Sequence, residues 1–386
     1  MAETNSSIAH REIIYSHWLI FGPLSCPVAF LGFVGNLFTL QTLSQPQLSC
    51  INSSVFLKFL SVADAAIIFF YFISFSIPVL ASKEVNDWMD NSAYYKVIYP
   101  LALISQTCGV YTVVLFSIVR YITICHPFGL HSFRTRRVAK IMVSCIFAFA
   151  VICNLPRVFE HVPIKLRVFN STCNCVTIEK TCLGEQNLYV KLYVSYGYTF
   201  GIFVIPVGIV SVLNARLGVL LHRVRHEFAE KKDDKPEGSN TLFNMRRDHK
   251  LNILLDSRSE NSEIPFRGQS GFIGDKSSVR MTHARARVTG RLFCLVSVFI
   301  VFQSLPMIDN LIIAFMSELK ETIPNYDDFY AICQFSVLVN SSINTVLYCF
   351  LGQRFRAAFR KMIHRWQDGC YTCLNLVSCQ PCSLTK

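Results

Sequence analysis

The sequence is short of charged residues. Asp, Glu, Lys and Arg make up 16% of the 386 residues, whereas 52% are hydrophobic and Phe alone occurs 32 times. Soluble domains carry about 25% charged residues, and soluble monomers rarely expose the large apolar patches that this composition would create. The composition therefore excludes an ordinary soluble protein and indicates a chain that resides in a lipid bilayer.

Signals of nucleic-acid binding and of catalysis are also missing. The formal net charge is +12, but the basic residues gather between or after apolar runs, as they do in cytoplasmic loops. No basic module with interleaved aromatic residues is visible. No nucleophile, base and orienting group converge at an enzyme-like spacing. We therefore expect no nucleic-acid partner, no enzymatic activity, no cofactor and no metal centre.

No cleavable secretory leader is evident, and the cysteines are not distributed as in the disulfide framework of a secreted protein. The segment Met1–Glu12 is polar and has no apolar core, so the first spanning helix is expected to direct insertion. Many of the 16 cysteines lie inside apolar runs, where a thiol acts as a small apolar side chain. These are Cys108, Cys145, Cys153, Cys294 and Cys349.

Long apolar runs, by contrast, are plentiful. A spanning helix needs about 20 mostly apolar residues, and backbone groups in hydrocarbon must bond within their own segment. Seven windows meet this condition: Trp18–Leu43, Val55–Ala81, Tyr95–Cys125, Val138–Val158, Val190–Leu221, Arg291–Met316 and Phe329–Leu351. We predict an all-α membrane protein with a seven-transmembrane helix bundle at residues 17–352. No internal repeat is visible.

Basic residues predict the orientation of the bundle. They follow the third and the seventh windows, which places both segments on the cytoplasmic side: Arg134, Arg136, Arg137, Lys140, Arg354, Arg356, Arg360, Lys361 and Arg365. The first inside loop, Gln41–Ser53, contributes no Lys or Arg. The N-terminal tail, residues 1–16, is then extracellular and the C-terminus cytoplasmic, as in a multi-pass plasma-membrane protein.

The side predicted to be extracellular leans acidic and carries two glycosylation sequons. The acidic residues are Glu84, Asp87, Asp90, Glu160, Glu179, Glu185, Glu318, Glu321, Asp327 and Asp328. Asn5 and Asn170 begin the sequons, and we expect both to be glycosylated. Sequons at Asn52 and Asn340 fall at the inner face and inside a helix, so they should stay unmodified.

Two cytoplasmic segments complete the domain organisation. Residues 223–287 are polar and too poor in apolar residues to bury a core, so we expect a largely disordered third loop. Its ends, near Arg223–Arg225 and Arg285–Arg291, should extend the fifth and sixth helices. Residues 353–386 form the cytoplasmic tail.

The tail begins with an amphipathic pattern. Phe355, Phe359, Met362 or Ile363, and Trp366 recur at helical spacing, and basic residues occupy the other faces. This pattern predicts a short eighth helix on the inner membrane surface, which makes membrane lipid a partner. A solvated helical tail is the alternative.

Polar residues inside the spanning windows carry the functional signal, because they are costly in lipid. They are Asn36 in the first window, Asp64 in the second, Arg120 and Tyr121 at the inner end of the third, and Asn344 and Tyr348 in the seventh. Each alone could be hydrogen-bonded glue between helices. Their joint occurrence in this order indicates a common mechanism.

These residues resemble the markers of rhodopsin-like (class A) G-protein-coupled receptors. The matching segments are Gly35-Asn36, Leu60 to Asp64, Arg120-Tyr121 with Cys125-His126-Pro127, Pro206, Pro306, and Asn344 to Tyr348. Three further segments look like the invertebrate FMRFamide-receptor-like group: Asn154 to Glu160, Leu213 to Leu217, and Gln303 to Pro306. The resemblance implies an extracellular neuropeptide ligand, activation of a heterotrimeric G protein, and arrestin and receptor kinase as further partners.

By that resemblance Arg120 is the G-protein switch, together with Tyr121, Asn344 and Tyr348. The family has an acid before the Arg, where this sequence has Val119. Loss of that carboxylate leaves the guanidinium without its usual partner. We expect a resting state shifted toward activity, or a restraint from the end of helix six instead.

The resemblance also implies a buried polar cluster of Asn36, Asp64, Asn340, Ser341 and Asn344 that can hold a sodium ion. Gly109 stands where the family often adds a hydroxyl, so a purely hydrogen-bonded cluster is the alternative. Pro206 and Pro306 should kink helices five and six. Ser304 replaces the usual Trp of helix six, and Thr345 replaces the usual Pro of helix seven.

The disulfide that pins helix three in most relatives is not expected here, since Tyr95 occupies its position. The second outer loop still holds Cys173, Cys175 and Cys182 in an oxidising compartment. We expect Cys182 to pair with Cys173 or Cys175, with free thiols as the alternative. In the tail, Cys370, Cys373, Cys379 and Cys382 are candidates for palmitoylation; a zinc site is the less favoured interpretation.

Two ligand classes of the resembled family are disfavoured. No acid lies between Tyr95 and Arg120 to pair with an amine, and Phe329–Leu351 contains no Lys for a Schiff base. The resemblance instead implies a short amidated peptide with a penultimate Arg. Candidate ligand residues are Gln106, Tyr111, Glu160, Glu185, Phe302 and Asp309. A seven-helix transporter and an orphan or signalling-altered receptor for another small ligand are the alternatives.

Overall fold

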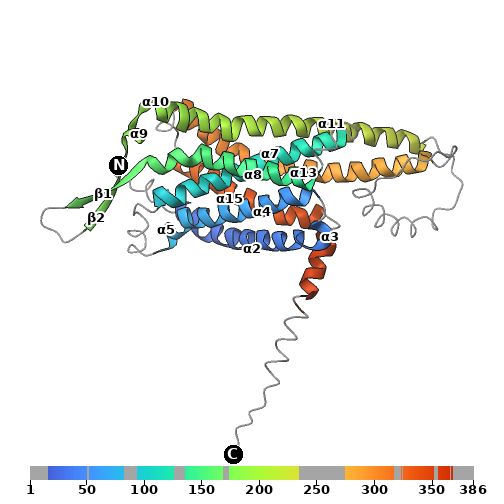
Figure 1. The fold of residues 1–386 in the computed structure, drawn as a ribbon, viewed down its shortest axis with the longest axis horizontal. Helices are drawn as coiled ribbons and strands as arrows, with labels where there is room; N and C mark the ends of the chain where they lie inside the picture. The colour runs from blue at the N-terminus through green and yellow to red at the C-terminus, as the bar shows by residue number, and fades with distance from the viewer. Residues whose placement is uncertain are drawn as a thin grey trace, which may run out of the picture.

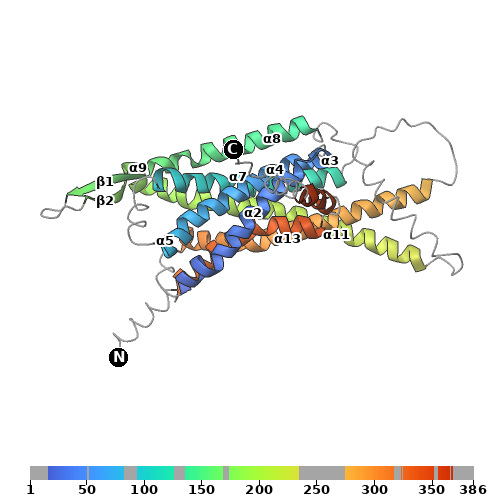
Figure 2. The ribbon, with the colours of Figure 1, turned by 90° about the horizontal axis from the view of Figure 1, so that it is seen from below.

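The computed structural model describes residues 16–49, 52–81, 94–125, 135–167, 174–233, 274–316, 323, 325–351, 355–365 and 367. Seven helical segments in this part of the chain are long and apolar enough to cross a membrane: Ser16–Leu43, Ser53–Leu80, Lys96–Thr123, Arg136–Phe159, Asn187–Val219, Val296–Phe315 and Tyr326–Cys349. They lie side by side as one bundle (Figures 1 and 2). The seven apolar windows and the bundle predicted from them are confirmed.

The longest elements of the bundle are α2 (Ser25–Leu43), α4 (Ser53–Tyr71), α7 (Tyr99–Cys125), α8 (Arg136–Asn154), α11 (Ile205–Asp233), α13 (Gly274–Phe315) and α15 (Tyr326–Leu351). Shorter helical pieces join or extend them: α3 (Pro46–Ser49), α5 (Ile77–Leu80), the 3-10 turn η5 (Leu155–Phe159), α9 (Cys182–Glu185) and α10 (Asn187–Tyr189). Large apolar side chains such as Phe30 and Ile152 remain exposed on the outside of the bundle. In a bilayer these side chains face lipid tails, which are as apolar as the side chains themselves.

Widened π-helical turns interrupt four of the spans: η1 (Ile20–Leu24), η2 (Phe72–Ser76), η3 (Tyr94–Ile98), and η6 with η7 (Val190–Gly197 and Thr199–Val204). Three of them end two residues before a proline, namely Pro78, Pro100 and Pro206. A proline ring clashes with the carbonyl of the preceding turn and cannot donate a backbone hydrogen bond. A widened turn accommodates both effects without ending the helix.

Two short antiparallel strands, β1 (His161–Arg167) and β2 (Asn174–Lys180), form a hairpin, with His161 opposite Lys180 and Arg167 opposite Asn174. We call the end of the bundle that carries them the hairpin end. Figure 1 shows this hairpin at one end of the bundle and the extensions of α11 and α13 at the opposite end. The sequence analysis does not predict the hairpin. An isolated two-stranded hairpin is marginal by itself, so its attachment to the helices matters.

The cytoplasmic loop predicted at residues 223–287 is shorter than expected. α11 continues to Asp233, and α13 begins at Gly274. The prediction that both helices extend into the connection is confirmed, but 223–233 and 274–287 are helical rather than disordered. Both stretches lack proline and are rich in good helix formers, whereas Pro236 follows α11 closely. The connection between the two helices therefore comprises residues 234–273, which lie outside the described part.

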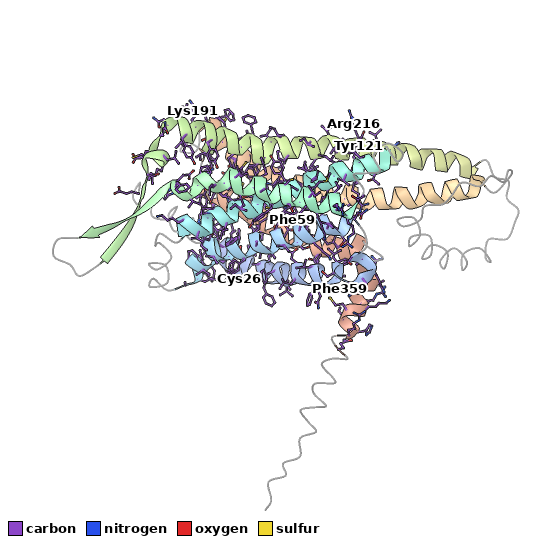
Figure 3. All side chains as sticks on the ribbon, in the orientation of Figure 1. Cys26, Phe59, Tyr121, Lys191, Arg216 and Phe359 are labelled. Carbon is purple, nitrogen blue, oxygen red and sulfur yellow. The ribbon has the colours of Figure 1, made fainter. Side chains whose placement is uncertain are left out.

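The predicted eighth helix is present at residues 355–365. Its apolar residues pack against the bundle: the Phe359 ring lies 6.2 Å from Phe38, and Ala358 accepts a hydrogen bond of 3.1 Å from Gln45. Met362 accepts a bond from the Thr42 hydroxyl. Much of the predicted apolar stripe is thus turned toward α2, while Trp366 lies outside the described residues. Phe359 marks this corner of the bundle in Figure 3.

The first and last helices of the bundle approach closely at a glycine. A Cβ atom placed on Gly32 of α2 would lie 2.1 Å from Oγ of Ser342 on α15. Only a residue without a side chain fits this contact, which is a common device for close packing of helices in membranes. The approach brings Asn36 on α2 against the backbone of α15.

Candidate functional site

A buried polar core occupies the middle of the bundle. The Asn344 amide donates a 2.7 Å hydrogen bond to Oδ2 of Asp64, whose side chain is 2% exposed. Ser341 lines the same cavity as this carboxyl group. Asn36 donates to the Ser341 carbonyl at 3.0 Å. Helices α2, α4 and α15 are therefore joined through one set of hydrogen bonds.

A small cavity lies beside this polar core. Its volume is about 20 Å³, and Asp64, Asn340, Ser341 and Asn344 line it together with Gly109. A cavity of this size has room for about one water molecule, or for a small monovalent cation. Four of the five residues predicted for the polar cluster thus share one cavity, and Asn36 adjoins it through Ser341.

Two glutamines also line the cavity. Gln303 of α13 is almost fully buried, and its Nε2 has no partner among the described residues. Gln106 of α7, predicted as a ligand residue, also lines this cavity and accepts a 3.4 Å hydrogen bond from the Tyr198 hydroxyl. In the sequence, Gln303 was noted only as part of a segment that resembles the family. A buried amide is costly in lipid, and this cost could have identified Gln303 as a candidate functional residue.

Arg120 lies at the end of the bundle opposite the hairpin. Its guanidinium donates to the Ser53 hydroxyl at the start of α4 and lies 5.2 Å from the Phe116 ring centroid. Val119, which stands where an acid was expected, packs in an apolar cluster with Phe56 and Phe116. The contact described for Arg120 therefore comes from the first residue of α4, the second spanning helix.

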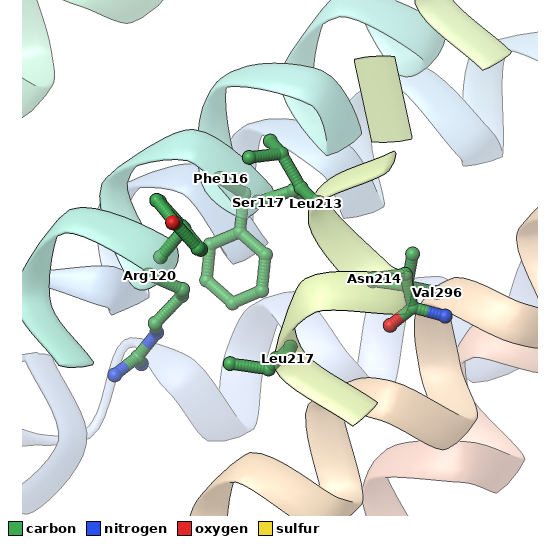
Figure 4. Close-up of a pocket in the computed structure, with 8 residues that line it drawn as sticks. Phe116, Ser117, Arg120, Leu213, Asn214, Leu217 and Val296 are labelled. Atoms are coloured by element: carbon green, nitrogen blue, oxygen red, sulfur yellow. The ribbon is translucent and has the colours of Figure 1, made fainter. Parts of the chain in front are cut away.

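A second cavity of about 20 Å³ adjoins Arg120 (Figure 4). Its lining comes from α7, α11 and α13: Phe116, Ser117, Arg120, Tyr121, Leu213, Asn214, Leu217 and Val296. The Asn214 amide donates a 3.0 Å hydrogen bond to the Ser297 hydroxyl and so joins α11 to α13. Outward movement of α13 would open this cavity and break that bond.

The four predicted switch residues divide between two places. Arg120 and Tyr121 line the cavity at the end of α7, whereas Asn344 belongs to the polar core. Tyr348 lies one helical turn beyond Asn344, and its ring is 5.9 Å from Phe355 of the eighth helix. Its hydroxyl is buried without a partner in the described part of the chain. The two groups are thus distinct. Tyr348 extends the polar side of α15 toward the end of the bundle where Arg120 lies.

Pro206 and Pro306 each leave a backbone carbonyl without its usual donor. In the π turn before Pro206, the amide of Ile205 donates to the Phe200 carbonyl, five residues back. The next donor in this register is missing at proline, and the Tyr111 hydroxyl donates to the Gly201 carbonyl at 2.8 Å instead. α13 continues through Pro306.

The seventh spanning helix, α15, brings a hydroxyl group to the carbonyl that Pro306 leaves free. In an α-helix the amide of residue 306 would donate to the carbonyl of residue 302. Proline has no amide hydrogen, and the Ser336 hydroxyl lies 3.2 Å from the Phe302 carbonyl, while its shorter hydrogen bond of 2.6 Å goes to the Cys333 carbonyl of its own helix. A polar side chain on a neighbouring helix therefore lies within hydrogen-bonding distance of the freed carbonyl at both prolines.

A buried ion pair lies at the hairpin end of the bundle, where the fourth spanning helix ends in η5. Arg157 and Glu160 lie 3.3 Å apart and are 4% and 5% exposed. The Arg157 guanidinium lies 5.5 Å from the Tyr193 ring centroid and 5.3 Å from that of Tyr198. Tyr189 donates a 2.8 Å hydrogen bond to Glu160. The carboxylate predicted to receive a ligand is thus already paired with a cation of the protein.

The β1–β2 hairpin is attached beside this ion pair. The Thr181 amide donates to the Glu160 carbonyl at 2.9 Å, and the Thr181 hydroxyl donates to the Phe159 carbonyl at 2.6 Å. A Cβ atom on Gly184 would meet the Glu160 carbonyl at 2.5 Å. The end of β2 is therefore fastened to the residues beside the ion pair.

Asp309 is the other buried carboxylate at the hairpin end. It is 2% exposed and accepts a 2.6 Å hydrogen bond from the Tyr326 hydroxyl. Nearby on α15, Asp328 accepts a hydrogen bond from Ser16, and the Asp327 carbonyl lies 3.1 Å from a ring nitrogen of His17. Acidic residues of α13 and α15 therefore gather at the hairpin end of the bundle.

The remaining predicted residues do not converge with these groups. Glu185 is exposed on α9, and Cys182 carries an exposed free thiol. Cys173, the side chain of Cys175 and the predicted glycosylation and palmitoylation positions lie outside the described residues. The pairing of the loop cysteines therefore stays a prediction.

Comparison with known proteins gives a consistent likeness. The family described as "7 transmembrane receptor (rhodopsin family)" matches residues 35–348. An FMRFamide receptor of Drosophila melanogaster is 24% identical over 349 residues, which cover 88% of this chain and 53% of the relative, so the chain spans about half of that relative's length. Neuromedin-U receptor 2 of Mus musculus is 24% identical, with 88% and 76% covered. The thyrotropin-releasing hormone receptor of Gallus gallus is 25% identical, with 86% and 75% covered.

Proposed function

Because the chain belongs to the rhodopsin family of seven-transmembrane receptors, we propose that it binds an extracellular neuropeptide and activates a heterotrimeric G protein. Members of this family are receptors and not enzymes, and the seven spans make the chain a multi-pass plasma-membrane protein. We take the hairpin end as extracellular and the Arg120 end as cytoplasmic. The basic residues beside Arg120 and on the eighth helix support this orientation.

We propose a short amidated peptide of the FMRFamide-like kind, with a penultimate Arg, as the ligand. The observation that carries this proposal is Asp309, a buried carboxyl group at the hairpin end that accepts a hydrogen bond from the Tyr326 hydroxyl. Asp327 and Asp328 follow Tyr326 on α15, and a group of carboxylates suits the guanidinium of a basic peptide. Glu160 is the weaker candidate, because Arg157 already pairs with it. The acidic residues at the hairpin end would steer a basic peptide toward the receptor.

The peptide proposal is tested by expressing the receptor with promiscuous G-protein reporters and applying a panel of amidated peptides. Asp309→Asn should weaken the response to peptides with an Arg, by about tenfold to a hundredfold for loss of a charge-assisted bond. The same peptides with citrulline in place of Arg should lose little further potency on that variant. Tyr326→Phe is the matched control, since it removes the phenol and keeps the carboxylate. Unchanged potency in Asp309→Asn would remove Asp309 from the ligand site.

On the cytoplasmic side we propose that Arg120, Tyr121 and the neighbouring cavity receive the G protein when α13 moves outward. Arg120→Ala should abolish the reporter signal while the receptor still binds peptide. Arrestin and a receptor kinase are the further partners that this role implies. In the polar core, the carboxylate and amide oxygens around the 20 Å³ cavity suit a sodium ion; a single bound water is the alternative. Sodium-dependent thermal stability that Asp64→Asn removes would support the ion.

A further inference from the structure

Two basic side chains converge at the Arg120 end of the bundle, outside the switch. Lys58 lies on α4 and Arg136 begins α8, and the two are close enough to interact electrostatically. The two helices pack against each other there, because Phe56 of α4 and Ala139 of α8 share one apolar cluster. Two like charges from different helices are therefore held together at one membrane surface.

Both cations lie on faces that look away from the bundle. Along α4, Val62 is 49% exposed and Phe69 is 50% exposed, four and eleven residues after Lys58. Along α8, Lys140 is exposed and Phe147 is 53% exposed, four and eleven residues after Arg136. Residues at these spacings share one helix face. Each helix thus presents a cation followed by apolar side chains that face lipid.

The part of the chain that the structure describes provides no compensating anion for this pair. Neither Lys58 nor Arg136 has a hydrogen-bond or ion-pair partner among the described residues. Arg136 also stands in the first turn of α8, where the helix dipole disfavours a cation. Near a membrane this arrangement is costly unless an anion binds between the two side chains. The amide groups at the start of the helix would bind the same anion.

We propose that Lys58 and Arg136, with Lys140 beside them, bind the phosphate of an anionic phospholipid of the inner leaflet. Lys58 lies about 7.5 Å along the helix from Ser53, at 1.5 Å per residue, so its long side chain reaches the headgroup level. The planar guanidinium of Arg136 donates two parallel hydrogen bonds to phosphate oxygens. The acyl chains then lie over Val62, Phe69 and Phe147. The charge and the apolar stripe together fit a lipid better than a soluble anion.

The test uses the full-length receptor, purified in a neutral detergent and titrated with phosphatidylserine or phosphatidylcholine, with bound lipid counted by native mass spectrometry. Lys58→Gln and Arg136→Gln should each weaken phosphatidylserine binding by about fivefold, and the double variant by about 25-fold. Lys58→Arg should retain binding. Arg137→Gln, which removes a neighbouring exposed cation, and Lys191→Gln, at the hairpin end (Figure 3), should bind as the unmodified receptor does.

Four outcomes would overturn the proposal. They are wild-type binding in the double variant, an equal loss in Arg137→Gln, full competition by inorganic phosphate, and weaker G-protein activation with unchanged lipid binding. The second would mean that any surface cation suffices. The third would mean a simple anion site, and the fourth an acidic segment of the G protein as the true occupant. The titration does not depend on which peptide activates the receptor.

Discussion

Replacing Arg157 with Met would leave the Glu160 carboxylate buried without a cation. Arg157 and Glu160 lie 3.3 Å apart and are almost fully shielded from solvent. Removing one member of a buried pair costs about 3–5 kcal/mol, because the remaining charge has lost its counter-charge and cannot regain water. The guanidinium also gives up its contacts with Tyr193 and Tyr198, whose cation–π energy is about 1–2 kcal/mol in a desolvated site. Arg157→Met should therefore be strongly destabilising.

The assay is thermal unfolding of the purified receptor, compared among three variants. Arg157→Met should lower the midpoint by on the order of 10 °C. Glu160→Gln alone leaves the guanidinium buried and should also destabilise. The double variant should recover much of the loss, because a neutral amide still accepts the Tyr189 hydroxyl and no unpaired charge remains. If Arg157→Met alone is as stable as the double variant, the reasoning from a buried ion pair is refuted.

The same variant should loosen the outer loop. Thr181 hydrogen-bonds to the Glu160 and Phe159 carbonyls, so a shift at Glu160 frees the end of the hairpin. Limited proteolysis should then cut residues 161–181 faster in Arg157→Met than in the unmodified receptor. These hydrogen bonds attach the hairpin to the end of the fourth spanning helix.

Three further changes test single contacts. Ser53→Ala should raise ligand-independent second-messenger output, by up to about tenfold, because it removes a bond to a charged group; equal output in Ser53→Ala and the unmodified receptor would exclude Ser53 as a restraint. Gly32→Ala should lower thermal stability by about 1–3 kcal/mol, and Ser342→Gly should restore part of it, since the two side chains collide. Tyr111→Phe should cost about 1–3 kcal/mol, because the Gly201 carbonyl loses its donor; a stable variant would show that another group can replace the phenol.

The bundle and its polar core were predictable because lipid makes buried polar groups expensive. Each spanning window is apolar enough to be recognised alone, and Asp64 and Asn344 stand out within such windows as groups that need a partner. They are 280 residues apart in the chain and bond to each other. We expected the two residues to cooperate because an unpaired polar group is costly in lipid. The particular bond between them depends on how the helices pack at Gly32 and along α4.

The partners of charged residues were predictable only where they are local. Glu160 lies three residues after Arg157, a spacing at which two side chains meet on one helical turn, and the 3-10 turn η5 brings them together. Arg120 bonds to Ser53, which lies 67 residues earlier. Nothing in the local sequence around Arg120 indicates this partner. A charged residue shows that a partner exists, but the identity of the partner depends on how the helices pack.

The prolines show the same division between local rule and tertiary outcome. A proline in a helix always removes one donor, so the sequence correctly marks Pro206 and Pro306 as positions where a carbonyl needs a new partner. At Pro206 the turn widens and a tyrosine of α7 donates; at Pro306 the helix continues and a serine of α15 lies 3.2 Å from the freed carbonyl. The tyrosine joins the fifth spanning helix to α7, and the serine brings α13 and α15 together. Any outward movement of α13 must therefore either carry the Ser336 contact with it or break it.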